Sequence, residues 1–120
     1  MIKILQSLKP IAAWLFYLTL AVVTALLLWP FAPTEPSWEY KDKVEHMTVF
    51  TILALLGGLS YQQSLKKVAL GLVIYGMSTE ILQGTLTTTR QASVADWLAD
   101  CAGIAIGLAI YRMLKKRKIA

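Results

Sequence analysis

Residues 11–29 read IAAWLFYLTLAVVTALLLW, a nearly unbroken apolar run. A helix needs roughly 20 residues to cross a hydrocarbon core of about 30 Å, so this run is long enough to span a membrane. Pro30 and Pro33 follow it, and proline ends a helix because it lacks the backbone N–H donor. The run is longer than the apolar core of a signal peptide and has no clear small-residue cleavage pattern. We therefore predict a retained transmembrane helix.

Three further apolar runs occupy residues 44–61, 68–86 and 94–114. The chain of 120 residues is 57% hydrophobic and 16% charged, with a mean hydropathy of +0.58, whereas about a quarter of the residues of a soluble domain are charged. A connection rich in Pro, Glu and Lys, residues 32–41, separates the first two runs. The sequence therefore predicts an all-α fold, a four-helix transmembrane bundle, as a single domain over residues 1–120 with no room for a separate soluble domain.

Basic residues are distributed unevenly over the predicted connections. With the N-terminus inside, nine lie on the cytoplasmic side and three outside, and cytoplasmic loops are enriched in Lys and Arg. We therefore expect both termini to be cytoplasmic in a multi-pass protein integral to the cytoplasmic membrane, with the carboxylates toward the outer side. The net charge of +5 then indicates membrane lipids with anionic headgroups, and no nucleic acid, as partners. The inner nine are Lys3, Lys9, Lys66, Lys67, Arg112, Lys115, Lys116, Arg117 and Lys118; the outer three are Lys41, Lys43 and Arg90.

Aromatic residues support the same direction, because Trp and Tyr are enriched at membrane interfaces. The outer interface is predicted at Trp29, Trp38, Tyr40 and Trp97. The inner one is predicted at Trp14, Tyr17, Tyr61 and Tyr111.

Asp42 and His46 are four residues apart, so their side chains can meet on one face at the outer start of the second helix. Lys43 flanks that face. A carboxylate beside a histidine fixes the tautomer of the ring and raises its basicity, which is the arrangement that a proton acceptor or a metal ligand needs. The alternative is helix-start chemistry, in which an acidic residue stabilises the positive end of the helix.

Glu80 and Gln83 lie three residues apart on the third predicted helix, and Gly76, one turn earlier, leaves this face uncrowded. An ionisable group inside a membrane is costly and by default indicates a functional site. Gln83 could equally be a structural hydrogen-bonding residue between helices. The candidate partners for Glu80 are Lys43, His46 and Arg90.

Arg90, Asp96 and Asp100 form a third polar group, and Ser93 is placed to cap the fourth helix. Arg90 suits an anionic ligand because its guanidinium offers a fork of donors, although a salt bridge to Glu80 or Asp96 would use it as well. The face of Asp96 and Asp100 continues through Gly103 and Gly107, a pair of small residues that permits close helix contact. We therefore expect this face to pack inside the bundle of one chain.

Read in order, these groups resemble the VanZ-like family of small membrane proteins, named for a teicoplanin-resistance accessory protein. The resemblance spans residues 42–107, and it implies a four-helix membrane protein linked to the cell envelope or to glycopeptide-antibiotic resistance. Two positions depart from the family pattern: Asp100 stands where Asn is usual, and Thr88-Thr89 where a Pro-Gly step is common. The matching pieces are Asp42-Lys43-x-x-His46-x-x-x-Phe50, Glu80-x-x-Gln83 and Arg90-x-x-Ser93-x-x-Asp96-x-x-x-Asp100-x-x-Gly103-x-x-x-Gly107.

Three functions remain open. The first is an accessory or binding role, in which an outer-leaflet polar pocket engages an envelope precursor or a polar lipid headgroup. The second is a membrane enzyme acting on a lipid-linked or phosphate-bearing substrate, with His46, Asp42 and Glu80 as catalytic candidates. The third is a small proton-coupled transporter that uses Glu80. The predicted ligand-binding residues are Asp42, Lys43, His46, Glu80, Gln83, Arg90, Asp96 and Asp100.

No metal and no cofactor is assigned from the sequence, because one histidine and several carboxylates at these spacings are an unspecific ligand pattern. The single Cys101 has no partner for an intrachain disulfide or a cysteine metal cluster, and we interpret it as a packing residue.

Overall fold

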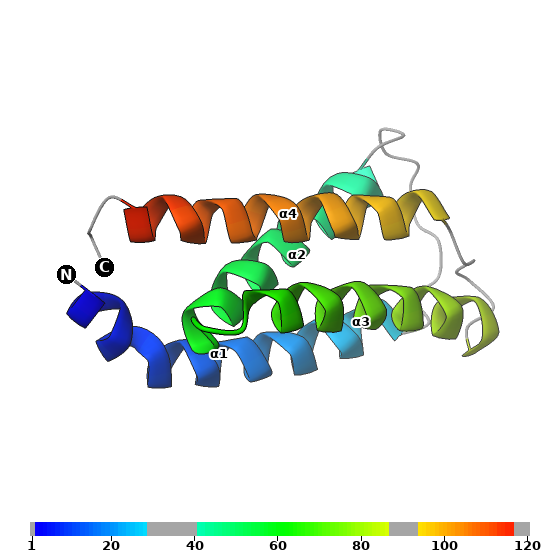
Figure 1. The fold of residues 1–120 in the computed structure, drawn as a ribbon. Helices are drawn as coiled ribbons and strands as arrows, with labels where there is room; N and C mark the ends of the chain where they lie inside the picture. Colours follow the sequence, from blue (N-terminus) through cyan, green and yellow to red (C-terminus); the bar gives the residue numbers. More distant parts are fainter. Residues whose placement is uncertain (1, 29–40, 87–93, 117–120) are drawn as a thin grey trace.

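The computed structural model describes the backbone of residues 2–28, 41–86 and 94–116, and the side chains of residues 7–26, 43–82 and 94–116. Its helices are α1 (Ile2–Leu28), α2 (Lys41–Ser60), α3 (Leu65–Leu86) and α4 (Val94–Lys116). These four helices confirm the predicted all-α class. In Figure 1 the beginning of α1 and the end of α4 lie at the same end of the elongated molecule.

The helix α1 begins nine residues earlier than the apolar run that predicted it, at Ile2 rather than residue 11, and contains Pro10 in its interior. Proline removes one helical hydrogen bond and crowds the preceding turn, which bends a helix when the flanking turns are otherwise satisfied. Figure 1 shows the first turns of α1, in dark blue, at an angle to the remainder. The predicted end of the run, Trp29, lies outside the described residues.

A short turn joins α2 to α3 and makes them antiparallel neighbours. The amide of Tyr61 donates to the carbonyl of Gly57 at 2.9 Å, and the amide of Ser64 donates to the carbonyl of Tyr61 at 2.9 Å. The carbonyl of Ser64 then accepts from Val68 at 3.0 Å, which starts the hydrogen-bond ladder of α3. The chain therefore reverses direction within residues 61–64 with its backbone groups engaged.

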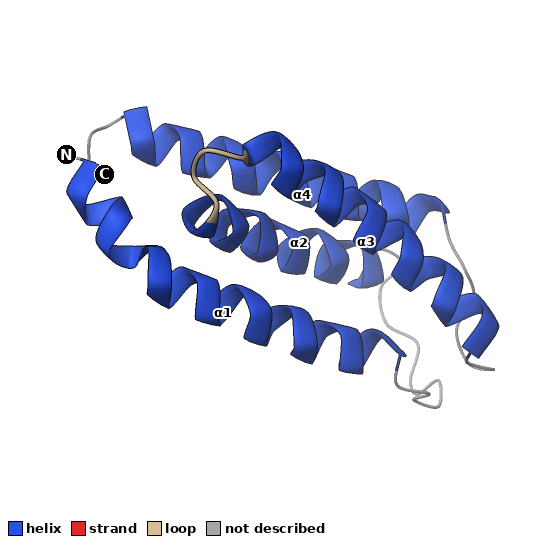
Figure 2. Cartoon of the chain, turned by 60° about the horizontal axis from the view of Figure 1, so that its bottom comes forward, coloured by secondary structure: helices blue, strands red, loops and turns tan. Residues whose placement is uncertain are grey.

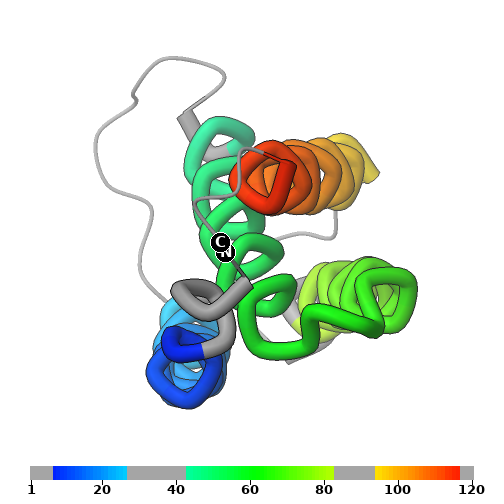
Figure 3. The backbone as a smooth tube through the Cα atoms, turned by 60° about the vertical axis from the view of Figure 1, so that its left-hand side comes forward, coloured from blue at the N-terminus to red at the C-terminus, as the bar shows by residue number. Residues whose placement is uncertain are grey.

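The helix α2 crosses the middle of the bundle, with α1, α3 and α4 around it (Figures 2 and 3). Its most extensive contact is with α4, where two glycines allow the backbones to approach closely. A β-carbon placed on Gly103 would lie 2.4 Å from the carbonyl oxygen of Met47, and one on Gly107 would lie 2.4 Å from that of Thr51. The predicted packing of the Gly103 and Gly107 face within one chain is thereby confirmed.

The apolar core lies where α2 meets the other three helices. Phe50 and Leu53 are fully buried on α2, and Phe16 of α1 packs into the same cluster. These aliphatic and aromatic side chains make many dispersion contacts across the helix interfaces, which stabilise the bundle. The other buried members of this cluster are Ala54, Val68, Leu72 and Ile104.

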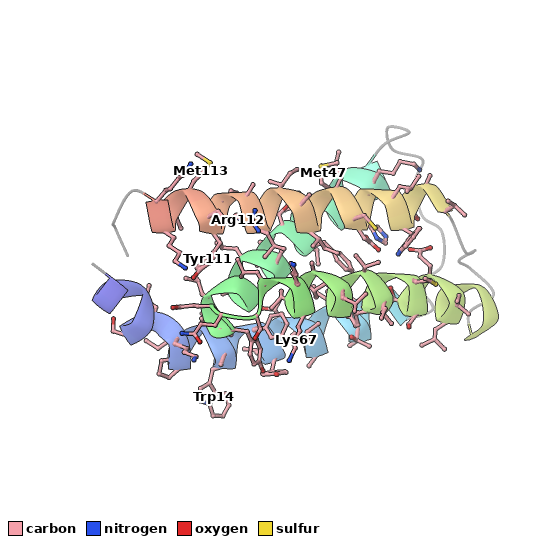
Figure 4. The ribbon with its side chains drawn as sticks, viewed as in Figure 1. Trp14, Met47, Lys67, Tyr111, Arg112 and Met113 are labelled. Carbon is pink, nitrogen blue, oxygen red and sulfur yellow. The ribbon has the colours of Figure 1, made fainter. Side chains whose placement is uncertain are left out.

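Tyr111 is a core residue and not the inner-interface anchor that its position in the sequence suggested. Its side chain is fully buried against Leu55, Leu59 and Leu65, and its ring occupies the space beside Gly58. In Figure 4 Tyr111 points into the bundle, whereas Trp14 points away from it. The missing side chain of Gly58 explains the difference, because it leaves room for a ring that would otherwise have to lie on the surface.

A hydrogen-bonded group joins α1 to α3. The hydroxyl of Thr24 lies 2.7 Å from the carbonyl oxygen of Leu20, to which it donates, and 2.5 Å from the hydroxyl of Tyr75. Tyr75 also reaches the Leu20 carbonyl at 3.4 Å. Polar side chains of this kind hold helices together where apolar burial offers little preference for one neighbour over another.

Much of the outer surface of the bundle is apolar. Residues 7–26 and 94–116 form two helical stretches that are long and apolar enough to cross a membrane. Large apolar side chains are also exposed on the other two helices, including Ile52 on α2 and Leu70 on α3, the latter 61% exposed. Apolar faces of this extent are characteristic of proteins whose helices contact lipid.

Candidate functional site

Ionisable side chains from α2, α3 and α4 gather at the end of the bundle opposite the termini. His46 lies near the beginning of α2, Glu80 in the second half of α3 and Asp100 in the second turn of α4. The helix α3 runs antiparallel to α2 and to α4 (Figure 1). One ligand atom from each of the three residues lies within 4.8 Å of the other two. The helical spacing in the sequence therefore identified residues that the fold brings into one place.

His46, Glu80 and Asp100 form a buried trio. The Nδ1 atom of His46 lies 2.7 Å from Oδ1 of Asp100, a hydrogen-bond distance, and 3.9 Å from Oε1 of Glu80. His46 is 7% exposed, Glu80 4% and Asp100 0%. Three ionisable groups at this depth are costly to bury. Contact with the imidazole lowers the cost of each carboxylate, whereas the two carboxylates repel each other when both are ionised.

Lys43 and Asp96 form a rim pair above the buried trio. The Nζ atom of Lys43 lies 3.5 Å from Oδ1 of Asp96, and the two side chains are 36% and 18% exposed. Oδ2 of Asp96 lies 3.9 Å from Nε2 of His46. The imidazole is thus between two carboxylates, Asp100 on its Nδ1 side and Asp96 on its Nε2 side, and the described site has more acidic than basic groups.

The second carboxylate oxygen of Asp100 faces α3. Oδ2 is buried and has no hydrogen-bond partner among the side chains and backbone that the structure describes. It lies 3.0 Å from the position that a β-carbon on Gly76 would take. The hydroxyl of Thr79 donates to the carbonyl of Gly76 and so offers Asp100 no hydrogen bond there. As the sequence suggested, Gly76 leaves this face of α3 open, and the group that occupies the space is Asp100.

The structure brings five of the eight predicted site residues together and adds one pairing that the sequence did not suggest. His46 pairs with Asp100 at 2.7 Å, and its Nδ1 atom also lies 3.9 Å from Glu80, for which it was one of the candidate partners. The side chains of Asp42 and Gln83 and the whole of Arg90 lie outside the described residues, so their predicted roles stay predictions. The five residues brought together are Lys43, His46, Glu80, Asp96 and Asp100.

Two neighbours of the site were not identified as its supports from the sequence. The indole Nε1 of Trp97 donates to the carbonyl of Val73 at 3.1 Å and so ties the start of α4 to α3. Phe50, one turn after His46, is fully buried and lies against Gly76. Trp97 had been interpreted as an interface anchor, and only the helix packing reveals its contact with α3.

The geometry of the buried trio suits a proton or a small cation. One nitrogen of His46 and one oxygen each of Glu80 and Asp100 all lie within 4.8 Å of one another. Imidazole and carboxylate are ligands for divalent transition metals, and the same groups can share a proton. The trio is too little exposed to contact a bulky polar ligand, so such a ligand would contact the rim pair.

A separate groove of about 520 Å³ lies between α1 and α3 near the turn at residues 61–64. Its lining is mostly apolar and includes Phe16, Leu20 and Gly71, with Lys67 at its edge. None of the five predicted site residues whose side chains the structure describes contributes to it. It therefore belongs to the other half of the molecule.

Comparison with known proteins gives one family. The model of the VanZ/LLP1 family matches residues 5–115, which include all of α2 and α3, nearly all of α1 and α4, and every residue of the candidate site. No curated protein matches the chain significantly, and no solved structure does.

Proposed function

Because the chain belongs to the VanZ/LLP1 family, we propose that it is a multi-pass protein of the cytoplasmic membrane with an accessory binding role in the cell envelope. The proposed ligand is a polar lipid headgroup or an envelope precursor, and the proposed setting includes the response to glycopeptide antibiotics. Two helical stretches long and apolar enough to span a membrane support the location. Exposed apolar side chains on α2 and α3 support spans by these helices as well.

The proposed topology has both termini in the cytoplasm and the candidate site at the outer side. It is supported by the excess of basic residues near the termini and the α2–α3 turn. The beginnings of α2 and α4, to which Lys43 and Asp96 belong, lie toward the end opposite the termini (Figure 1). In this orientation Lys43 and Asp96 are the first of the described site residues that a ligand from the outer leaflet meets, and the buried trio lies beneath them.

The observation that carries the proposed function is the convergence of His46, Glu80 and Asp100 from three helices at one buried point. Packing alone does not require it, since apolar side chains of similar volume would fill this space without a desolvation cost. Ionisable groups inside membrane proteins are retained chiefly where they bind or move something. The rim pair adds a carboxylate and an ammonium that can recognise a zwitterionic group.

Substituting Glu80 by Gln is expected to abolish the phenotype that the protein confers while leaving its amount in the membrane unchanged. The side chain keeps its size and loses its charge, so insertion should proceed as before. Arg90→Ala, which removes the predicted anion-binding group, is expected to have the same effect. The measurement is glycopeptide susceptibility of a host with and without each variant, beside the membrane content of the protein.

Glu45→Gln is the matched control, because Glu45 lies on α2 next to His46 but is exposed. It removes the same charge from outside the site and should leave the phenotype intact. A normal phenotype in both Glu80→Gln and Arg90→Ala would contradict the proposed function.

The proposed orientation predicts which positions an impermeant thiol reagent reaches in intact cells. In a Cys101→Ser background, a cysteine at Glu45 should react from outside, and a cysteine at Lys115 should react only after permeabilisation. Both positions are exposed in the structure, so sidedness alone decides the outcome. Labelling of the Lys115 position in intact cells would reverse the proposed topology.

A membrane enzyme is the second candidate function, and the contact between His46 and Asp100 favours it. A histidine whose Nδ1 is held by a carboxylate has its other nitrogen oriented for proton transfer. In this alternative Asp100 orients His46, and the predicted role of Asp42 stays a prediction because its side chain lies outside the described residues. Turnover of a lipid-linked phosphate by the purified protein, and its loss in His46→Gln, would select this function over binding.

A further inference from the structure

We propose that His46, Glu80 and Asp100 form a binding site for one divalent transition-metal ion, with Zn²⁺ as the ion that best fits the ligands. This inference rests on the proposed function only in that both assign a role to the same side chains. It goes beyond that function because the ligand proposed there is a polar lipid headgroup or an envelope precursor and not a metal ion. The site would lie beneath the rim pair, where an ion fits and a headgroup does not.

The spacing of the three ligand atoms is close to what an ion requires. Protein ligands hold Zn²⁺ at about 2.0–2.2 Å, so two ligands on one ion stand roughly 3.0–3.5 Å apart. In the structure Nδ1 of His46 is 2.7 Å from Oδ1 of Asp100 and 3.9 Å from Oε1 of Glu80. Changes of several tenths of an ångström, within the reach of side-chain rotation, bring both distances into range.

An independent observation comes from the second oxygen of Asp100. Oδ2 is buried, has no hydrogen-bond partner among the described groups, and belongs to a side chain that is 0% exposed. A buried carboxylate oxygen without a donor is costly, and native structures rarely retain one without a ligand or a functional reason. Asp100 can lie this close to α3 because Gly76 lacks a side chain. A cation bound by both oxygens of Asp100 would engage this atom.

The surroundings of His46 match those of a metal ligand. A histidine that binds a metal through one nitrogen usually donates the other N–H to a carboxylate, which fixes its tautomer. Oδ2 of Asp96 lies 3.9 Å from Nε2 of His46, on the side away from the trio, and Lys43 holds the other oxygen of Asp96 at 3.5 Å. A small movement of Asp96 would complete this hydrogen bond.

Charge also favours a divalent ion. With a neutral imidazole and two ionised carboxylates, the trio carries two negative charges in a buried position. Lys43 already lies against Asp96 and is 36% exposed at the rim. One imidazole and two carboxylates without a thiolate form a ligand set for Zn²⁺, Mn²⁺ or Fe²⁺, of which Zn²⁺ binds most strongly to a given site.

The test is Zn²⁺ binding by the whole chain in detergent, after removal of any affinity tag and extraction with a chelator. Competition with a chromophoric chelator should reveal one Zn²⁺ per chain. His46→Gln, Glu80→Gln and Asp100→Asn should each weaken binding at least tenfold, whereas Glu45→Gln should leave it unchanged. Co²⁺ should compete for the site and give a visible absorption spectrum that these three variants lose.

The wild-type result stands independently of how the variants fold. Failure of the wild-type chain to bind Zn²⁺ or Co²⁺ stoichiometrically would overturn the inference, as would binding that all three substitutions leave intact. Loss of the phenotype in Glu80→Gln together with no metal binding would overturn the metal site and leave the proposed function in place. Zn²⁺ binding by the wild-type chain, together with a normal phenotype in both Glu80→Gln and Arg90→Ala, would support the metal site and contradict the proposed function.

Discussion

Replacing Gly103 by alanine is expected to separate α4 from α2 and to destabilise the bundle by at least 1–3 kcal/mol, roughly the usual cost of overpacking. The added β-carbon would lie 2.4 Å from the carbonyl oxygen of Met47 and 3.0 Å from the β-carbon of Phe50. These atoms belong to or adjoin the backbone, so they cannot rotate away, and the helices themselves must move. Gly107→Ala meets the Thr51 carbonyl in the same way and should have a similar effect.

The measurement is the free energy of unfolding in mixed detergent micelles, followed by tryptophan fluorescence. Gly71→Ala is the matched control, because a β-carbon on Gly71 meets nothing within 4 Å. This substitution also replaces a poor helix former by the best one, so it should be neutral or slightly stabilising. Equal stability of Gly103→Ala and Gly71→Ala would show that α2 and α4 do not approach as closely as described.

Replacing His46 by leucine is expected to cost roughly 3–5 kcal/mol of unfolding free energy, because it leaves Asp100 buried without the imidazole that contacts it. The double variant His46→Leu/Asp100→Leu should recover much of this loss, since it removes the stranded carboxylate as well. A double-mutant cycle, measured in the presence of a chelator so that metal binding does not contribute, should therefore give a coupling energy of roughly 1–3 kcal/mol.

The partly exposed rim pair, Lys43 and Asp96, serves as the control for the buried pair in this double-mutant cycle. Lys43 and Asp96 are 3.5 Å apart but partly exposed, and a solvent-accessible ion pair contributes only about 0–1 kcal/mol. Lys43→Met should therefore change stability far less than His46→Leu does. Additive effects of the His46 and Asp100 substitutions would mean that the two side chains do not interact in the folded protein.

The four helices were predictable because the hydrophobicity and the length of each apolar run can be read from one continuous stretch of sequence. The starts of α2 and α3 lie three residues before the predicted ones. The start of α1 was less predictable, since residues 2–9 are too polar to extend an apolar run, yet a helix can continue through them. Apolar patterning detects the part of a helix that contacts lipid or core, and a helix can extend beyond that part.

Polar spacing along the helices identified five residues that the fold brings together, but it did not suggest the contact between His46 and Asp100. Spacing along one helix placed Asp42, whose side chain lies outside the described residues, beside His46; Asp100, 54 residues away in the chain, lies 2.7 Å from His46. Such contacts depend on the rotation of α4 about its axis and on its distance from α2. The close approach of the two backbones at Gly103 determines both. The burial of Tyr111 also depends on helix packing, because its ring occupies the position beside Gly58 where a side chain would otherwise lie.

An experimental structure of the protein in a lipid bilayer tests the central claim most directly, namely that the buried trio and the rim pair form a ligand site. The account predicts non-protein density in contact with His46, Glu80 and Asp100, or with Lys43 and Asp96 above them, on the outer side of the membrane. A closed network in which these five side chains satisfy one another, with no bound group between or above them, would contradict it and assign them a structural role.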